Sequence, residues 1–273
     1  MAIDPATHPG AVRLRASDAA ALADFYERTI GLERLGEVAL GAGGRPLIEL
    51  EPDPGAPPRP PRTTGLFHLA ILVPSRAELG AALRRIAAAG WGLTGASDHL
   101  VSEALYLDDP EGNGIEIYRD RPRDEWSYVD GELQMATLPL DLRAIAAEAP
   151  SEAMPMSGET RMGHVHLNVA DIDDSRRFYV DTLGFDVTVD SYMGALFVSA
   201  GGYHHHLGLN VWNGPGAPPP PVGARGLAHF RLITGEEIGG LAARLDAGGY
   251  EAELGAEHVQ TSDPAGNRIL IGR

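Results

Sequence analysis

The sequence predicts an α+β fold built from four βαβββ modules, which would pair into two incomplete β-barrels. The first observation is an internal repeat, because residues 10–34 match residues 163–187 without a gap. The second is a shared Asp-Pro-x-Gly-Asn turn, which begins at Asp109 in one half and at Asp263 in the other. Turns of this composition typically join two strands. The chain is therefore expected to consist of two similar halves.

Each module is expected to begin with an apolar strand that leads into a helix closed by a glycine. In the first repeat the strand runs into Asp18 or Asp171, which can cap the helix that follows. A second repeat, between residues 65–90 and 226–249, has the same strand and an Ala/Leu-rich amphipathic helix. The modules are expected near residues 9–53, 64–119, 161–213 and 225–272.

Proline-rich segments and one long connection divide the chain. Residues 51–61 and 214–221 are rich in proline, and each segment is expected to link the two modules of one half. Between the halves, Leu138–Glu148 has the pattern of an amphipathic helix, which is expected to pack across the halves. The predicted domains are residues 1–120 (first pair of modules), 121–160 (linker with a helix) and 161–273 (second pair).

Composition excludes several classes of function. The 273 residues carry a formal net charge of −16, which disfavours nucleic acid or an anionic membrane as a partner. The chain has no cysteine, which excludes disulfides, thiolate zinc sites and a cysteine nucleophile. No apolar run approaches the roughly 18 residues of a membrane span, and the first ten residues lack the pattern of a signal peptide. A cytoplasmic enzyme is the expectation.

The stretch Asp98–Tyr118 carries the clearest chemical signal. After the turn at Asp109, strand alternation places Ile115 and Ile117 on one face and Glu116 on the other. A lone carboxylate that faces the interior of a barrel needs a compensating partner, and a metal ion is the usual one. Glu116 is therefore a candidate metal ligand.

Equivalent positions in the four modules show which of them can complete a metal site. The matching first-strand positions are Ala11, His68, His164 and His229. The fourth-strand position is Glu116 in the second module but Leu270 in the fourth. The pairing of modules two and three offers His68, Glu116 and His164, whereas the pairings of one with two, three with four, and one with four each lack at least one ligand. Two imidazoles and one carboxylate, with open positions opposite, are the ligand set of non-haem Fe(II) oxygenases.

Two ambiguities follow from strand geometry. His166 lies two residues after His164, hence on the same strand face, and is an alternative ligand. In the run from His204 to His206, alternation sends His205 to the face opposite its two neighbours, so either His205 or His206 faces the site. His205 is the preferred candidate.

Several segments resemble the vicinal-oxygen-chelate superfamily, which includes glyoxalases, bleomycin-resistance proteins and extradiol dioxygenases. These segments are GLFHLAIL (65–72), DHLVSEALYLDDPEGNGIEIY (98–118), GHVHLNVAD (163–171) and YHHHLGLN (203–210). Within the superfamily the chain is similar to the extradiol ring-cleaving dioxygenases of the catechol 2,3-dioxygenase type. The resemblance extends over nearly the whole chain through the four modules.

The resemblance implies a metal, two substrates and a reaction. In this family the corresponding residues would be His68, His164 and Glu116, and they would bind Fe(II), or less often Mn(II). The substrates would be a small aromatic diol of the catechol type and O2, and the ring would be cleaved beside the diol. Hydroquinone-cleaving relatives share the ligand set, so the ligand set does not distinguish a catechol substrate from a hydroquinone. Related proteins often assemble, so a homo-oligomer is compatible with the resemblance.

The resemblance also implies three catalytic residues. His205 matches the family's acid–base histidine in the pattern H-x-x-[AG]-[LF], and Tyr106 matches the tyrosine that precedes the Asp-Pro turn. His99 matches the histidine upstream of that tyrosine, with a slightly different spacing. One departure concerns the location of the site: better-known members place their ligands in the last two modules, whereas the fourth module here has Leu270 in place of the acid.

Two other functions from the same superfamily remain in competition. A glyoxalase-like isomerase or thiol transferase usually has a fourth protein ligand, but the sequence Gly208–Asn210 offers no acid in the third module. A metal-free drug-binding protein of the bleomycin-resistance type would not need to keep the two histidines and the glutamate. The dioxygenase is therefore the preferred interpretation.

Overall fold

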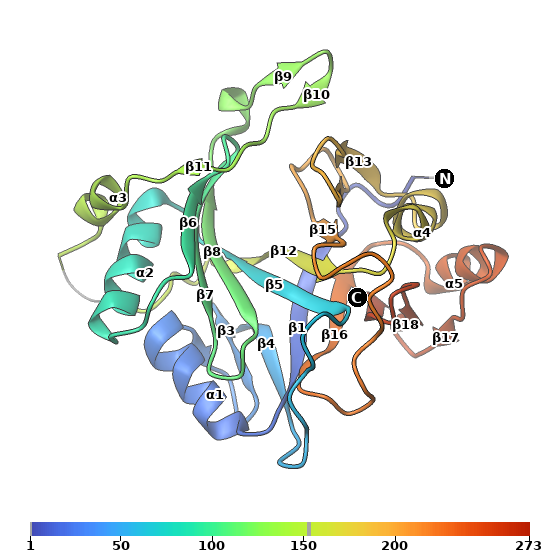
Figure 1. Ribbon diagram of the computed structural model, residues 1–273, viewed down its shortest axis with the longest axis horizontal. Helices are drawn as coiled ribbons and strands as arrows, with labels where there is room; N and C mark the ends of the chain where they lie inside the picture. The colour runs from blue at the N-terminus through green and yellow to red at the C-terminus, as the bar shows by residue number, and fades with distance from the viewer. Residues whose placement is uncertain (1, 152–153) are drawn as a thin grey trace. The chain divides into compact units, whose positions relative to one another are not determined.

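The computed structural model describes residues 2–151 and 154–273, and it shows a mixed α+β fold with two curled sheets (Figure 1). All four predicted βαβββ modules are present. The first consists of β1 (His8–Ala16), α1 (Ala19–Phe25), β2 (Glu33–Arg34), β3 (Ala39–Ala42) and β4 (Arg45–Pro52). The second consists of β5 (Gly65–Leu72), α2 (Arg76–Ala88), β6 (Gly95–Asp98), β7 (Ser102–Asp108) and β8 (Gly114–Asp120).

The C-terminal modules repeat this order. The third consists of β12 (Arg161–Asn168), α4 (Ile172–Arg176), β13 (Asp186–Val189), β14 (Ala195–Ser199) and β15 (Leu207–Asn210). The fourth consists of β16 (Gly226–Ile233), α5 (Ile238–Ala247), β17 (Glu253–Leu254), β18 (His258–Ser262) and β19 (Arg268–Gly272). Among the described residues, no helix combines the length and the apolarity that a membrane span requires.

The predicted helix caps are confirmed in the first and third modules. The Asp18 carboxylate accepts a hydrogen bond from the amide of Ala21, and the Asp171 carboxylate accepts one from Asp174. Each helix then continues into a π-helical segment, Tyr26–Ile30 or Arg177–Thr182. The repeat in sequence is therefore also a repeat in local geometry.

The chain forms two compact units. The first comprises Met1–Arg15, Ala56–Phe67 and His164–Arg273, and the second comprises Ala16–Gly55 and His68–Gly163. The predicted division into residues 1–120, 121–160 and 161–273 follows the sequence repeat, whereas the compact units group two N-terminal segments with the C-terminal half.

In the second unit, β8 lies between β7 and β5. β8 is antiparallel to β7 and parallel to β5, and β6 follows β7 as its antiparallel neighbour. Helix α2 packs against this part of the sheet (Figure 1). Alternation along β8 gives one face of buried isoleucines, Ile115 and Ile117, and another face with Glu116 and Tyr118.

The connection 121–160 departs from the prediction at its helix. Helix α3 is Leu142–Glu148, and the preceding residues Leu138–Pro139 form strand β11, which pairs with β6. Proline at position 139 disfavours helical geometry in the residue before it, and Asp141 caps the helix by accepting hydrogen bonds from two amides. The predicted start at Leu138 was therefore wrong.

The position of α3 also differs from the prediction. α3 packs on α2 within the second unit, where a Cβ atom at Gly80 would overlap the carbonyl oxygen of Ile145. It was expected to pack across the halves. Residues 152–153 of this connection lie outside the described part of the chain.

A short β-ribbon precedes β11. It consists of β9 (Tyr128–Val129) and β10 (Glu132–Leu133), after a 3₁₀ turn at Arg123–Glu125. In Figure 1 the ribbon extends away from the ends of β6 and β8. Its turn has Asp130 at φ 51° and Gly131 at φ 86°, the positive angles of the tight hairpin turns that Asp-Gly favours.

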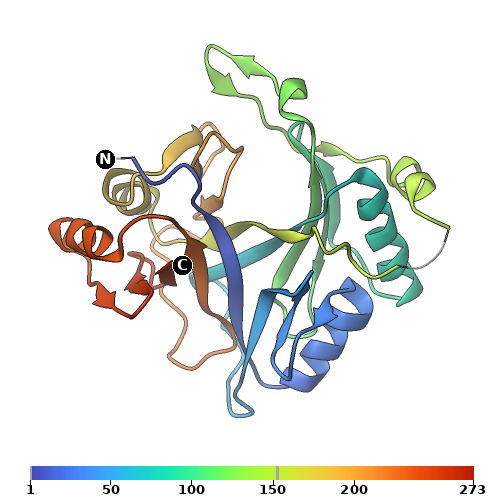
Figure 2. The ribbon, with the colours of Figure 1, turned by 180° about the vertical axis from the view of Figure 1, so that it is seen from behind.

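In the first unit, each module also pairs its first strand in parallel with its last. β12 is parallel to β15, which is antiparallel to β14, and β14 to β13. β16 is parallel to β19 and antiparallel to β1, and β18 joins β19 to β17. Figure 2 shows α5 beside β17 and β18.

Candidate functional site

Glu116 lies on the face of β8 opposite Ile115 and Ile117, as the alternation predicted. Its side chain is buried, and its Oε2 atom lies 2.9 Å from Nε2 of His68. The parallel ladder of β5 and β8 explains this contact: Ala70 pairs with Glu116, so His68 lies two residues earlier on the same face. Two predicted metal ligands therefore come together within one unit.

Tyr106 is the third predicted residue on this face. It pairs directly with Glu116 across the antiparallel ladder of β7 and β8, so both side chains point to the same side. The rings of Tyr106 and His68 have centroids 5.6 Å apart. Tyr106 therefore lies next to both predicted ligands.

His99 is joined to Tyr106 by a hydrogen bond. Nε2 of His99 lies 2.7 Å from the Tyr106 hydroxyl, and Nδ1 lies 2.6 Å from the carbonyl oxygen of Ala136. A carbonyl oxygen only accepts, so Nδ1 carries the hydrogen and donates it. In the neutral ring, Nε2 must then accept the hydrogen of the Tyr106 hydroxyl. The structure thus pairs two of the predicted catalytic residues.

The turn that precedes β8 is fixed by Asp109. Its carboxylate accepts hydrogen bonds from the amides of Glu111 and Asn113, from Nδ2 of Asn113, and from the hydroxyl of Tyr26 at 3.0 Å. Burial raises the pKa of Asp109, and burial together with the Asp109 charge raises the pKa of Tyr26 well above its ordinary value. These bonds set the start of the strand that carries Glu116.

His164 lies on β12 in the first unit, where it is buried. Its ring centroid is 4.1 Å from that of His205, and the His205 ring packs on Phe197 at 5.0 Å. The predicted acid–base histidine is therefore in contact with a predicted ligand.

The histidine run that contains His205 is not part of a strand, because β15 begins only at Leu207. Nδ1 of His204 lies 2.8 Å from Nδ1 of His205. His206 instead accepts a hydrogen bond from the amide of Ala200 and stacks on Tyr203. The strand alternation expected for this run does not hold, although it is His205 whose ring lies against His164.

His166 lies in an aromatic cluster. Its ring centroid is 5.0 Å from that of Phe67, 5.6 Å from Phe197 and 5.4 Å from Trp212. In the ladder of β12 and β15 it pairs with Gly208, where a Cβ atom would come within 2.8 Å of the ring. His166 thus fills the space over Gly208.

The strand ladders show which residue the third and fourth modules have at the position of Glu116. The pair Ala70 and Glu116 in the second module corresponds to His166 and Gly208 in the third. In the fourth module the same ladder position pairs Arg231 with Leu270. The fourth module therefore has an arginine paired with leucine where the second module has alanine paired with Glu116.

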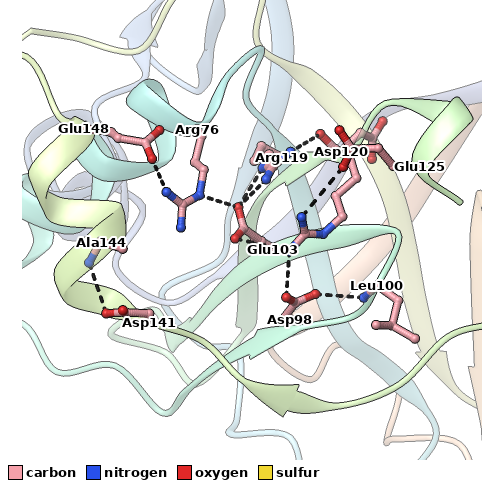
Figure 3. Close-up of polar contacts among 11 residues, drawn as sticks. Arg76, Asp98, Leu100, Glu103, Arg119, Asp120, Glu125, Asp141, Ala144 and Glu148 are labelled. Carbon is pink, nitrogen blue, oxygen red and sulfur yellow. Dashed lines mark hydrogen bonds and ion pairs between the residues drawn. The ribbon is translucent and has the colours of Figure 1, made fainter.

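An ion-pair network centred on the buried Glu103 was missed by the sequence reasoning (Figure 3). Glu103 on β7 is buried, and its Oε2 atom accepts hydrogen bonds from Nε of Arg76 at 2.8 Å and from Nε of Arg119 at 2.7 Å. Arg121 binds Asp98 at 2.7 Å and reaches Glu103 at 3.5 Å. The available signal in the sequence was the pair of arginines two residues apart, Arg119 near the end of β8 and Arg121 just after it, which indicates acidic partners on one face.

The network also sets the charge of Asp98. Burial would raise the pKa of this carboxyl, but the hydrogen bonds from the Leu100 amide and the Arg121 guanidinium outweigh it and lower the pKa below its ordinary value. Asp98 is therefore an anion next to His99 in sequence.

The donor set fits a divalent metal ion. His68 and Glu116, both buried, bring an imidazole and a carboxylate together in the second unit, and the buried His164 offers a further imidazole in the first unit. A buried carboxylate carries a desolvation cost that a cation offsets. The 2.9 Å contact between Glu116 and His68 already brings two donor atoms close together. These ligand types suit iron and manganese.

Comparison with known proteins gives the family. The model of the Glyoxalase/Bleomycin resistance protein/Dioxygenase superfamily matches residues 8–117 and 161–271. A protein of Bacillus subtilis (strain 168) named catechol-2,3-dioxygenase is 42% identical over 276 residues, which is 97% of this chain and 96% of that protein.

Two crystal structures share the fold. A Bacillus subtilis subsp. subtilis str. 168 protein has a TM-score of 0.69 at 15% identity, covering 100% of this chain and 86% of that one. Glyoxalase I from Zea mays has a TM-score of 0.58 at 14% identity, covering 98% of this chain and 92% of that one. We conclude that the chain belongs to the Glyoxalase/Bleomycin resistance protein/Dioxygenase superfamily, as an extradiol dioxygenase-like enzyme.

Proposed function

We propose that this enzyme cleaves the ring of a catechol-type aromatic diol with O2, beside the diol, using one metal ion held by His68, Glu116 and His164. The observation that carries the proposal is the contact of 2.9 Å between His68 and the buried carboxylate of Glu116, beside Tyr106. The identity of 42% to a catechol-2,3-dioxygenase supports the same reaction. Fe(II) is the proposed metal, with Mn(II) as the alternative.

The charge of the ligand set suits a diol substrate. Two neutral imidazoles and one carboxylate leave a divalent ion with a net positive charge, which favours an anionic diolate. When bound, the metal supplies Lewis-acid activation of the diol and the redox chemistry that O2 requires. The protein contributes the buried setting, in which charge interactions are stronger than in water.

Tyr106 and His99 are proposed to orient the diol and to hold one proton between them. The Tyr106 hydroxyl donates to Nε2 of His99, so its oxygen keeps lone pairs that can accept a hydrogen bond from a substrate hydroxyl. When the proton of the substrate hydroxyl moves to the Tyr106 oxygen, the proton of the Tyr106 hydroxyl can pass to Nε2 of His99. The Ala136 carbonyl keeps Nδ1 of His99 protonated during this exchange.

His205 is proposed as the general acid and base. Its ring lies against His164, and its Nδ1 atom is engaged by His204 at 2.8 Å. We therefore assign proton transfer to Nε2 of His205. In this proposal His164 is the ligand and His166 is part of the aromatic cluster with Phe67.

The glyoxalase alternative lacks a favouring observation. An isomerase of that type would need a fourth ligand, and the ladder position that matches Glu116 in the third module is Gly208. The likeness to glyoxalase I from maize, at 14% identity, shows the fold alone.

The proposal extends to the setting of the enzyme. Its partners would be the aromatic diol and O2, with no nucleic acid and no membrane, as the net charge of −16 indicates. A cytoplasmic location and a homo-oligomer remain part of the proposal, and both can be measured by cell fractionation and by light scattering of the purified chain.

The test is direct. The protein is purified anaerobically, loaded with Fe(II) or Mn(II), and mixed with catechol in air-saturated buffer. We expect O2 uptake together with the yellow absorbance of a ring-opened semialdehyde. A panel of substituted catechols and hydroquinones then identifies which aromatic diols the enzyme accepts. The proposal is wrong if the protein binds neither metal and turns over no diol of the panel.

A further inference from the structure

His99 lies in a turn that its neighbours must support. The turn joins β6 to β7, and Leu100 in it has φ 68°, in the left-handed region that is unfavourable for a residue with a side chain. The Asp98 carboxylate offsets this cost, because its Oδ1 atom accepts a hydrogen bond of 2.9 Å from the Leu100 amide. The His99 amide donates to the carbonyl of Ser102 at 2.8 Å.

Arg121, the residue directly after β8, supports the same turn. Its guanidinium binds Oδ2 of Asp98 at 2.7 Å, so both oxygens of that carboxylate are engaged. The Arg121 amide donates to the carbonyl of Val101 at 2.8 Å, on the far side of the turn. Arg121 thus binds the turn both before His99, at Asp98, and after it, at Val101.

The orientation of Arg121 is itself set by acidic neighbours. Its guanidinium reaches Glu103 at 3.5 Å and Glu125 at 3.8 Å. Glu103 is held in place by Arg76 and Arg119 at 2.8 Å and 2.7 Å. Because Glu103 is buried, these charge-assisted bonds are stronger than their surface equivalents.

Asp98 also locates the acceptor of the His99 ring. In the pairing of β6 with β11, Asp98 lies opposite Leu138, two residues after Ala136. The Ala136 carbonyl is the atom that accepts the hydrogen of Nδ1. A shift of Asp98 therefore moves the imidazole and its acceptor relative to each other.

We propose that Asp98 and Arg121 are positioning residues for His99. They hold the imidazole where Nδ1 donates to Ala136 and Nε2 accepts from Tyr106. This inference rests on the proposed function of His99 and Tyr106, and it adds two residues that contact neither the metal ligands nor the Tyr106 hydroxyl among the hydrogen bonds described. Misplacement of a catalytic group by about 1 Å costs about 100-fold in rate, so a loosened turn should slow the reaction.

The kinetic test uses graded variants of the Fe(II)-loaded full chain. Asp98→Ala should lower kcat by about 10- to 100-fold and leave KM for catechol within about twofold, because ring orientation and not substrate binding is lost. Asp98→Asn keeps an oxygen for the Leu100 amide and should lose less. Arg121→Ala should resemble Asp98→Ala, and Arg121→Lys should recover part of the loss.

Arg76→Ala is the matched control. Arg76 binds Glu103 and Glu148 but not Asp98. Its removal leaves Glu103 held by Arg119, so the contacts of Arg121 with Glu103 and Asp98 are kept. We expect kcat within about twofold of the native value. If Arg76→Ala lowers kcat as much as Asp98→Ala does, the network acts through general stability and the proposal is overturned.

A second readout needs no turnover. In ¹⁵N spectra of the metal-free full chain, His99 is identified by the signals that His99→Gln removes. The native ring should show Nδ1 as the protonated nitrogen, and Asp98→Ala should show a mixture of tautomers. An unchanged His99 spectrum in Asp98→Ala would overturn the positioning role. If no diol is cleaved by the native protein, the proposed function fails, while this spectrum still decides the positioning of His99.

Discussion

The hydroxyl of Tyr179 donates a hydrogen bond of 3.0 Å to Oδ2 of Asp263, in the turn between β18 and β19. Tyr26 and Asp109 make the same contact at the same distance in the other half. Asp263 also accepts from the amides of Ala265 and Asn267 and from Nδ2 of Asn267. A helix of one module is thereby tied to a turn of the next.

Removal of the Tyr179 hydroxyl should destabilise the protein without affecting the metal site. In Tyr179→Phe, the buried Asp263 carboxylate loses one of its four donors, which should cost about 1–3 kcal/mol of unfolding free energy. Urea unfolding measures the loss. Tyr250→Phe, which keeps its ring against Phe178, is the control and should be nearly neutral. Equal losses in the two variants would contradict the assigned bond.

The same turn predicts a pH dependence. Burial raises the pKa of Asp263 in the folded protein above its ordinary value of about 3.9. Between these two values the folded state binds more protons than the unfolded state, so this group stabilises the protein progressively as the pH falls through the window. The Asp263→Asn variant has no carboxyl group at this position, so this contribution to stability does not change with pH.

The measurement compares unfolding free energies of the native protein and Asp263→Asn at several pH values from neutral down to about 4, the range that the ordinary carboxyl pKa bounds. The advantage of the native protein over the variant should grow as the pH is lowered. An advantage that shrinks on acidification would show that the carboxyl is not raised in pKa.

Metal content should depend on Glu116 but not on the histidine of the fourth module. Glu116→Ala removes the one carboxylate of the proposed ligand set and should lower bound iron from about one equivalent to near zero, while the circular dichroism spectrum stays native. His229→Ala, at the matching first-strand position of the fourth module, should keep its iron. Full metal content in Glu116→Ala would show that the metal is bound by other residues.

Loss of the Tyr106 hydroxyl should affect catalysis more than binding. In Tyr106→Phe, Nε2 of His99 loses its hydrogen-bond donor and the diol loses its contact, so kcat should fall by about 100- to 10,000-fold, the range for general acid–base groups. Stopped-flow absorbance with saturating catechol checks this. Retention of most of the native kcat would mean that Tyr106 is a structural residue.

The fold was largely predictable because the sequence repeats itself. Matching modules gave the element order, the caps at Asp18 and Asp171, and the turns at Asp109 and Asp263, all of which the structure contains. The helix at Leu138–Glu148 was misjudged because a period of apolar residues continues through β11, whereas Pro139 and Asp141 decide where the helix begins.

The candidate site was predictable only in part. Strand alternation placed Glu116 correctly, and the ladder register then brought His68 and Tyr106 beside it. The Asp98–Arg121 pair and the Ala136 carbonyl depend on how a turn meets a distant backbone, which no local pattern encodes. Likewise, His205 lies outside a strand, so alternation was the wrong argument for its position.

Arg231 stands against a metal site in the fourth module. A single replacement of Leu270 by glutamate would place the new carboxylate opposite a guanidinium in the ladder, and the pair would neutralise itself before any cation could bind. A metal site there would need at least two changes, of which the first alone brings no cation. The proposed site therefore draws one module from each half, and the fourth module contributes as scaffold.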